Sequence, residues 1–268
     1  MTKLVGILNI TPNSFSDGGK FLKPQDTISH AMQLLDQGAD ILDIGAVSTS
    51  YGAKLLNHEE EWLRLHPVLS EVCTDQKMLS QISIDTYNPK TAKECINMGI
   101  KMINDVSGGS NLEMLELIGG HSQVKYVLMY SKVLPANRSI RARDFQEIYD
   151  FGASSILKAQ KYGIKKEQLI FDPGIGFATD PKLSFEVIKN IKLLEKLNIP
   201  LYIGHSRKSF FESVSKLKPE DRDIETLAAS IYMMMQNISY LRVHNVAIHK
   251  RALNVISELA NENISSKF

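Results

Sequence analysis

Short apolar runs alternate with longer amphipathic segments along the whole chain. The runs are only a few residues long and rich in branched side chains, as buried parallel strands are. The expected strands are residues 3–8, 41–44, 81–84, 102–103, 124–129, 169–172, 201–203 and 240–243. The segments between them predict helices over 27–37, 59–73, from 89, from 112, over 144–162, 183–197, 223–236 and up to about 260. The pattern therefore predicts eight successive strand-helix units.

Eight such units in 268 residues match the size of a (β/α)8 TIM barrel. A doubly wound open sheet gives the same alternation and is the alternative. The barrel makes a further demand, because its functional side chains lie at the C-terminal ends of many different strands. We expect an α/β fold with one barrel domain over residues 1–268.

The expected strands do end in polar side chains. The run 169–172 ends in Asp172, and Pro173, Gly174 and Gly176 then prevent a regular continuation. A carboxylate followed by backbone without bulky side chains is better suited to binding a ligand than to packing. The other strand ends carry Asn9, Asp43, Asp85, Asn104, Met129 with Tyr130, Ser206 to Lys208, and Arg242 with His244.

Asp85, Asn104 and Asp172 predict an acceptor-rich pocket for a flat heterocycle with adjacent N–H donors, because an ionised carboxylate only accepts hydrogen bonds. Lys208 is placed to bond a ring carbonyl or nitrogen, and Arg207 to stack on the ring or contact its outer side.

A second patch is expected where the first and eighth strands meet. Asn9, Arg242 and His244 supply donors there that suit phosphate oxygens. Taken singly, each of these polar residues has another explanation, as a helix cap, a solvated loop charge or a buried core histidine. Their joint occurrence at successive strand ends favours a binding site.

Composition and charge limit the classes of binding partner that the chain is expected to have. Lys and Arg total 31 against 30 for Asp and Glu, so no strong overall field draws the chain to nucleic acid or to a membrane surface. Cys73 and Cys95 lack metal-ligand spacing and are expected to be reduced thiols. The sequence contains no apolar run of about 18 residues, and a cytoplasmic protein is expected.

In order along the chain, the strand-end motifs resemble those of dihydropteroate synthase, the pterin-binding TIM-barrel family. They are residues 6–12 (Gly-Ile-Leu-Asn-Ile-Thr-Pro), 14–19 (Ser-Phe-Ser-Asp-Gly-Gly), 38–45 (Gly-Ala-Asp-Ile-Leu-Asp-Ile-Gly), 83–86 (Ser-Ile-Asp-Thr), 103–105 (Ile-Asn-Asp), 172–177 (Asp-Pro-Gly-Ile-Gly-Phe), 206–208 (Ser-Arg-Lys) and 242–244 (Arg-Val-His). The resemblance implies a transferase of folate biosynthesis that joins (7,8-dihydropterin-6-yl)methyl diphosphate to 4-aminobenzoate. It also implies Mg2+ as cofactor and a homodimer formed through the last helices.

The resemblance also implies roles for individual residues. Asp85, Asn104, Asp172 and Lys208 are expected to bind the pterin. Asn9 is expected to bind Mg2+ with the diphosphate, and Thr49, Arg242 and His244 to bind diphosphate oxygens. Phe177, Ser206, Lys208 and the loop 12–19 are expected to bound the aminobenzoate site. The expected catalytic residues, which position the amine or neutralise the leaving diphosphate, are Asp17, Lys208, Arg242 and His244.

The second loop departs from the family pattern, which is roughly Glu-Ser-Thr-Arg-Pro-Gly. Ser50 stands where the family has an arginine, and Thr179 occupies a place often taken by lysine. Asn13 and Tyr130 replace a common aspartate and a common histidine. These changes predict altered tolerance of sulfonamides, which mimic 4-aminobenzoate. The alternative function is that of a pterin-binding paralogue that has lost turnover.

Overall fold

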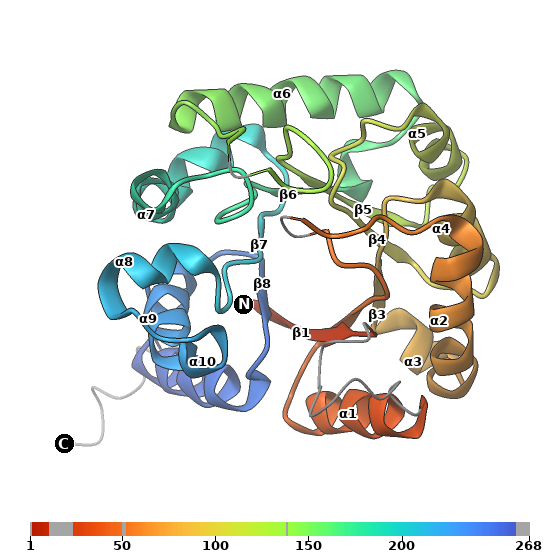
Figure 1. Ribbon diagram of the computed structural model, residues 1–268, viewed down its shortest axis with the longest axis horizontal. Helices are drawn as coiled ribbons and strands as arrows, with labels where there is room; N and C mark the ends of the chain where they lie inside the picture. The colour runs from red at the N-terminus through yellow and green to blue at the C-terminus, as the bar shows by residue number, and fades with distance from the viewer. Residues whose placement is uncertain (1, 11–23, 50–51, 138, 261–268) are drawn as a thin grey trace.

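The computed structural model describes residues 2–10, 24–49, 52–137 and 139–260. Helices surround a barrel of eight parallel strands (Figure 1). The strands are β1 (Lys3–Asn9), β2 (Ile41–Gly45), β3 (Ile82–Asp85), β4 (Met102–Asp105), β5 (Lys125–Met129), β6 (Leu169–Asp172), β7 (Tyr202–Ile203) and β8 (Tyr240–Val243). The α-helices are α1 (Pro24–Asp36), α2 (His58–Val72), α3 (Gln76–Ser80), α4 (Pro89–Asn97), α5 (Leu112–Gly119), α6 (Phe145–Lys161), α7 (Pro181–Lys189), α8 (Glu212–Ser215), α9 (Asp223–Met234) and α10 (Val246–Ala260).

The strand order is β6-β5-β4-β3-β2-β1-β8-β7, and every neighbouring pair is parallel. The two ends of this order meet at a bridge between Phe171 and Leu201. The Phe171 N–H also donates to the carbonyl oxygen of Pro200 at 2.9 Å. Because the sheet closes on itself, the predicted barrel is confirmed and the open sheet is wrong.

Most predicted elements are present, with shifts of a few residues at their ends. The predicted helix 183–197 is instead α7 followed by a 3-10 segment, Ile191–Leu197. The α-helical hydrogen bonds end at Asn190, a residue of low helix propensity whose backbone φ of −102° is not helical. The short helix α3 was not predicted, because its five residues are too few to show a helical period.

The helix starts follow local capping chemistry. Asn57 and Glu60 form a reciprocal capping box at the start of α2. Asp180 caps α7 by accepting from the Leu183 N–H at 2.8 Å, and Pro181 follows it in the first turn. The chain between β6 and α7 is therefore fixed at the point where it leaves the barrel.

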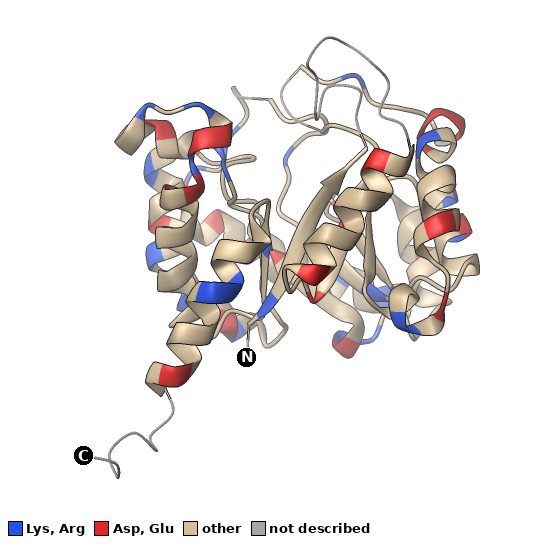
Figure 2. Ribbon diagram, turned by 90° about the horizontal axis from the view of Figure 1, so that it is seen from below, with Lys and Arg blue, Asp and Glu red and all other residues tan. Residues whose placement is uncertain are grey.

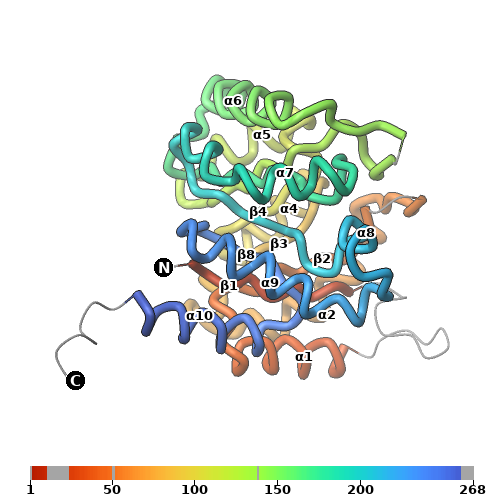
Figure 3. The backbone as a smooth tube through the Cα atoms, turned by 90° about the vertical axis from the view of Figure 1, so that its left-hand side faces the viewer, coloured from red at the N-terminus to blue at the C-terminus, as the bar shows by residue number. Residues whose placement is uncertain are grey.

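The barrel interior has two layers because side chains alternate along each strand. The lower layer is apolar and consists of Val5, Ile41, Met102, Val127, Ile170 and Tyr202. Two residues further along the chain come Ile7, Asp43, Asn104, Met129, Asp172 and Gly204. Three of these six are polar, so the polar side chains of the interior lie in the layer at the C-terminal ends of the strands. Figure 3 shows α8 and the segments after β2 and β5 at that same end of the molecule, away from both termini.

A second apolar shell packs between the strands and the helices and contains the larger part of the core. Basic and acidic residues are interspersed along the helices rather than gathered by sign (Figure 2). Among the described residues, no helix is both long and apolar enough to cross a membrane.

Candidate active site

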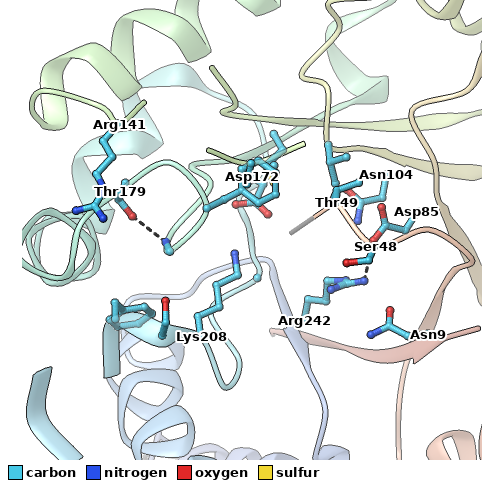
Figure 4. A pocket seen from close by; sticks show the side chains of 18 of the residues that line it. Asn9, Ser48, Thr49, Asp85, Asn104, Arg141, Asp172, Thr179, Lys208 and Arg242 are labelled. Atoms are coloured by element: carbon cyan, nitrogen blue, oxygen red, sulfur yellow. Dashed lines mark hydrogen bonds and ion pairs between the residues drawn. The ribbon is translucent and has the colours of Figure 1, made fainter. Parts of the chain in front are cut away.

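A cavity of about 570 Å³ opens at the C-terminal ends of the strands. Eight of the residues that the sequence singled out line it, from seven different strands or the segments that follow them. They are Asn9, Thr49, Asp85, Asn104, Asp172, Phe177, Lys208 and Arg242. Figure 4 labels all of them except Phe177 and shows the labelled side chains converging from opposite sides of the cavity.

A buried aspartate connects the polar side chains of this cavity. Asp43 has no exposed surface, and its Oδ2 accepts from Arg242 Nε at 2.6 Å and from Asn104 Nδ2 at 2.9 Å. Arg242 also donates through Nη2 to Asp85 Oδ2 at 2.9 Å. These four residues, from β2, β3, β4 and β8, form one network that we call the Asp43 cluster.

The Asp43 cluster changes one expectation. The sequence predicted a phosphate-binding patch separate from the acceptor pocket, whereas Arg242 spans both by bonding Asp43 and Asp85. The sequence assigned no role to Asp43. The signal was its place in the strand pattern, two residues after the inward-facing Ile41.

The pKa values of three titratable groups in the cavity are shifted toward 7. Burial raises the pKa of Asp85 to about 7, and the nearby Arg242 offsets only part of this rise. Burial likewise raises the pKa of Asp172 to about 6, against the opposing effect of Lys208. Burial lowers the pKa of Lys208 to about 8, although Asp172 favours its charged form. Such pKa shifts are frequent at functional sites, where ionisable side chains are buried next to other charged groups.

The loop after β6 positions Asp172 and Lys208. Asp172 Oδ1 accepts from the Gly174 N–H at 2.7 Å, and Lys208 Nζ donates to the Ile175 carbonyl oxygen at 2.6 Å. Gly174 has a φ of +67°, and an added Cβ would collide with the carbonyl oxygen of Tyr130. Only glycine fits this position, which explains the Pro-Gly pair that follows Asp172.

The turn after β7 holds Arg207 away from the cavity. Arg207 has a left-handed φ of +59°, and its N–H donates to Thr226 Oγ1 at 3.0 Å. Its guanidinium donates to both oxygens of Asp223, at 2.7 and 2.9 Å. This bidentate ion pair holds the guanidinium against α9, and Arg207 is not among the residues that line the cavity, so its expected contact with a bound ring stays a prediction. The same bonds fix the backbone before Lys208.

His244 and Ser206 lie behind the cavity and bond each other. His244 Nδ1 and Ser206 Oγ are 2.9 Å apart, and neither residue lines the cavity. Burial, together with the positive charges of Arg207 and Arg242, lowers the pKa of His244 to about 3, so its ring is neutral at pH 7. β8 ends at Val243, and His244 follows past the point where alternation directs Arg242 inward. Their predicted roles toward the substrates stay predictions.

Other lining residues were missed or lie outside the described part of the chain. Arg141, in the loop between β5 and α6, lines the cavity, and only the basic character of that loop hinted at it. Tyr130 is buried and donates to Glu147 at 2.8 Å instead of facing the cavity. Asp17 and Ser50 lie outside the described residues. Among the described residues, no cluster of three or more His, Cys, Asp or Glu side chains could hold a metal ion.

Comparison with known proteins identifies relatives of the chain. A family model described as pterin binding enzyme matches residues 5–244. The chain is 37% identical over 263 residues to the folate synthesis bifunctional protein of Chlamydia caviae. This match covers 94% of this chain and 58% of that protein. It therefore spans somewhat more than half of that relative. Over 266 residues it is 34% identical to the dihydropteroate synthase type-3 of Escherichia coli, covering 97% of this chain and 100% of the relative.

Solved structures are similar over nearly the whole barrel. The dihydropteroate synthase of Anaplasma phagocytophilum with bound 6-hydroxymethylpterin-monophosphate matches with a TM-score of 0.87 at 33% identity, over 97% of this chain and 99% of that one. The dihydropteroate synthase of Xanthomonas albilineans with 4-aminobenzoic acid matches with a TM-score of 0.89 at 31% identity, over 97% and 94% of the two chains.

Proposed function

Since the chain belongs to the family of pterin-binding enzymes that includes the dihydropteroate synthases, we propose that it is itself a dihydropteroate synthase. Its substrates are (7,8-dihydropterin-6-yl)methyl diphosphate and 4-aminobenzoate, and its products are 7,8-dihydropteroate and diphosphate. The observation that carries the proposal is the convergence of the buried Asn104 and Asp172 and the partly buried Asp85 in one cavity that also holds Lys208 and Arg242.

A pterin ring fits these acceptors chemically. Its 2-amino group and ring N–H groups are donors along the ring edges, while its carbonyl and ring nitrogens accept. Asp85 and Asp172 accept when ionised, and Lys208 donates when protonated. Binding in a buried cavity gives these charge-assisted bonds more weight than they have in water. The similar structure with a bound pterin phosphate supports this assignment.

The diphosphate is assigned to the cavity wall that holds Asn9, Thr49 and Arg242. Arg242 places a guanidinium there, and its remaining N–H groups suit phosphate oxygens. The described residues offer no closed cage of carboxylates, so a Mg2+ ion would enter with the diphosphate. It would take the side-chain oxygen of Asn9 as a protein ligand, which matches the preference of Mg2+ for few protein oxygens plus phosphate and water. When bound, the ion neutralises charge on the leaving diphosphate.

The reaction requires no protein nucleophile. The C–O bond between the pterin methylene and the diphosphate breaks, and its electron pair leaves with the diphosphate. The electron-rich pterin delocalises the positive charge that develops on the methylene carbon. The amine nitrogen of 4-aminobenzoate then forms the new C–N bond and releases one proton to solvent. The protein positions both partners and stabilises the departing charge through Arg242. Phe177 offers an aromatic face for the arylamine.

The proposal extends to assembly and location. Tyr232 on α9, Met235 directly after it, and Val255 and Leu259 on α10 are exposed apolar side chains, which supports a homodimer through the last helices. Light scattering on the purified protein would measure the mass directly, and a monomer at micromolar concentration would exclude this arrangement.

Both cysteines are free thiols, which supports a cytoplasmic enzyme.

Turnover separates the synthase from a pterin-binding paralogue without activity. The purified protein is incubated with pterin diphosphate, 4-aminobenzoate and Mg2+, and diphosphate release is followed over time. A synthase releases diphosphate in proportion to 7,8-dihydropteroate formed, and only with both substrates present. Saturable pterin binding without release would identify the silent paralogue and refute the proposed activity.

A further inference from the structure

Lys208 enters the cavity from the turn that follows β7. Figure 4 shows its side chain extending into the cavity, and its Nζ donates to the Ile175 carbonyl oxygen at 2.6 Å. Its aliphatic stem packs on Gly176, where an added Cβ would lie 2.7 Å from Lys208 Cδ. Lys208 itself lies between the end of β7 and the short 3-10 segment Ser209–Phe211. The direction of its side chain therefore depends on what holds the turn before it.

That turn has its unusual conformation at Arg207. Arg207 has a left-handed φ of +59°, which is unfavourable for a residue with a Cβ. Its N–H donates to Thr226 Oγ1 at 3.0 Å, and its carbonyl oxygen accepts from Arg222 Nη1 at 3.1 Å. Thr226 lies in α9, and Arg222 lies directly before it. The start of α9 therefore binds both backbone groups of Arg207. Relaxation to a right-handed φ would turn Lys208 in another direction.

Asp223, in the first turn of α9, binds the side chain of Arg207. Its two carboxylate oxygens accept from Arg207 Nε and Nη2 at 2.7 and 2.9 Å, and Oδ2 also accepts from Asn245 Nδ2 at 2.9 Å. Burial raises the pKa of Asp223, but the hydrogen bonds from Arg207 and Asn245 outweigh this effect and lower the pKa below its usual value. Asp223 is therefore ionised at pH 7, and its carboxylate is fixed from two sides.

The start of α9 reaches a ligand only through this turn. The lining of the cavity, as far as the structure describes it, includes Lys208 but none of Arg222, Asp223 and Thr226. Arg222 is almost fully buried and also bonds Leu217 and Glu212, so its loss would disturb a wider region. The Asp223 side chain is 24% exposed and has an isosteric replacement in asparagine. Asp223 is therefore the residue at which the turn can be loosened most selectively.

We propose that Asp223 is a positioning residue, which acts through Arg207 to direct Lys208 into the cavity where the pterin binds. This inference rests on the proposed synthase function, in which Lys208 bonds the pterin. Asp223 contacts neither the substrates nor the reacting atoms. It sets the backbone conformation from which Lys208 extends.

The test measures the affinity of Asp223→Asn for 6-hydroxymethylpterin monophosphate by calorimetry. Asparagine can still accept from Asn245, but it loses the charge and the bidentate bond to Arg207. The Kd is expected to rise about five- to twentyfold, because Lys208 no longer keeps one direction. Asp223→Glu retains the charge and is expected to recover part of the loss. In steady-state kinetics the KM for pterin diphosphate is expected to rise by a similar factor, and the KM for 4-aminobenzoate to stay within about twofold.

A double-mutant cycle shows whether the effect passes through Lys208. Once Lys208→Gln has removed the amine, Asp223→Asn is expected to weaken pterin binding further by less than about twofold. A role in the fold alone would give a different result. It would lower the folded fraction, and hence kcat per mole of protein, and would leave both KM and Kd unchanged.

Asp221→Asn is the matched control, because Asp221 is an exposed carboxylate in the 3-10 segment Pro219–Asp221 that precedes α9. It is expected to leave all these values unchanged. Normal pterin affinity in Asp223→Asn would overturn the inference. An equal loss with and without the Lys208 amine would also overturn it. A parent protein that binds the pterin without releasing diphosphate refutes the synthase alone, because the calorimetric cycle still measures the role of Asp223.

Discussion

Replacing Asp172 by asparagine tests whether the buried carboxylate serves the ligand rather than the fold. Asp172 is 4% exposed, and its Oδ1 accepts from the Gly174 N–H at 2.7 Å. Asparagine has the same shape and can keep this bond through its carbonyl oxygen. The substitution therefore removes one charge from the cavity with little change in packing.

The expected change in stability follows from the pKa. Burial raises the pKa of Asp172 from the usual 3.8 to about 6, so between these values the folded protein holds the proton more firmly than the unfolded chain. Above pH 6 the ionised group therefore destabilises the fold, by at most about 3 kcal/mol for a rise of this size. Lys208 loses its carboxylate neighbour in the variant, which reduces the gain. At pH 8 we expect the free energy of unfolding of Asp172→Asn to be about 1–2 kcal/mol higher than that of the parent protein.

The expected change in binding has the opposite sign. The amide has only one acceptor oxygen, and its NH2 group faces the ring donors of a pterin. Loss of charge-assisted hydrogen bonds at about 1.5–3 kcal/mol each weakens pterin binding by about 100-fold or more.

Titration calorimetry with 6-hydroxymethylpterin monophosphate measures the affinity, and urea unfolding at pH 8 measures the stability. Asp26→Asn, at an exposed position of α1, is the control for the loss of one carboxylate. Near-normal pterin affinity in Asp172→Asn would refute the role of this carboxylate. A large fall in the free energy of unfolding would show that the fold requires this carboxylate, and would refute the conclusion that it serves ligand binding.

Three further changes probe the rest of the site. Asp43→Asn removes the buried counter-charge of Arg242, and we expect a loss of about 2–3 kcal/mol in urea unfolding and a raised KM for pterin diphosphate; unchanged stability would contradict the Asp43 cluster. Gly174→Ala forces a Cβ into a backbone carbonyl at a left-handed φ, so we expect a loss of at least about 2 kcal/mol and of pterin affinity, and an unaltered melting temperature would contradict this. Pterin affinity is expected to fall below pH 7, where Asp85 takes up a proton, and above pH 8, where Lys208 loses one; a flat calorimetric profile from pH 6 to 9 would refute both assignments.

The sequence predicted the barrel and the convergence of the strand-end acceptors in one cavity, and for a physical reason. In a barrel the strand ends meet at one face, so Asp85, Asn104 and Asp172 could be placed together from strand order alone. The glycines after Asp172 marked the loop because few other residues adopt its backbone conformation.

What the sequence could not show were contacts that depend on side-chain direction. Arg242 and His244 are two residues apart, yet one enters the cavity and the other bonds Ser206 behind it. Arg207 is adjacent to Lys208, yet it pairs with Asp223 on a helix 16 positions further along. Asp43 resembled any strand-end carboxylate until the structure placed two partners on one of its oxygens.

The most direct test of the account is a crystal structure of the protein with pterin diphosphate analogue and 4-aminobenzoate bound together. The account predicts the pterin ring in the cavity between Asp85, Asn104 and Asp172, with its N–H groups on Asp85 and Asp172 and its carbonyl edge toward Lys208. The diphosphate lies against Asn9 and Arg242. A pterin bound outside the barrel end, or one whose donors bond neither carboxylate, would contradict it.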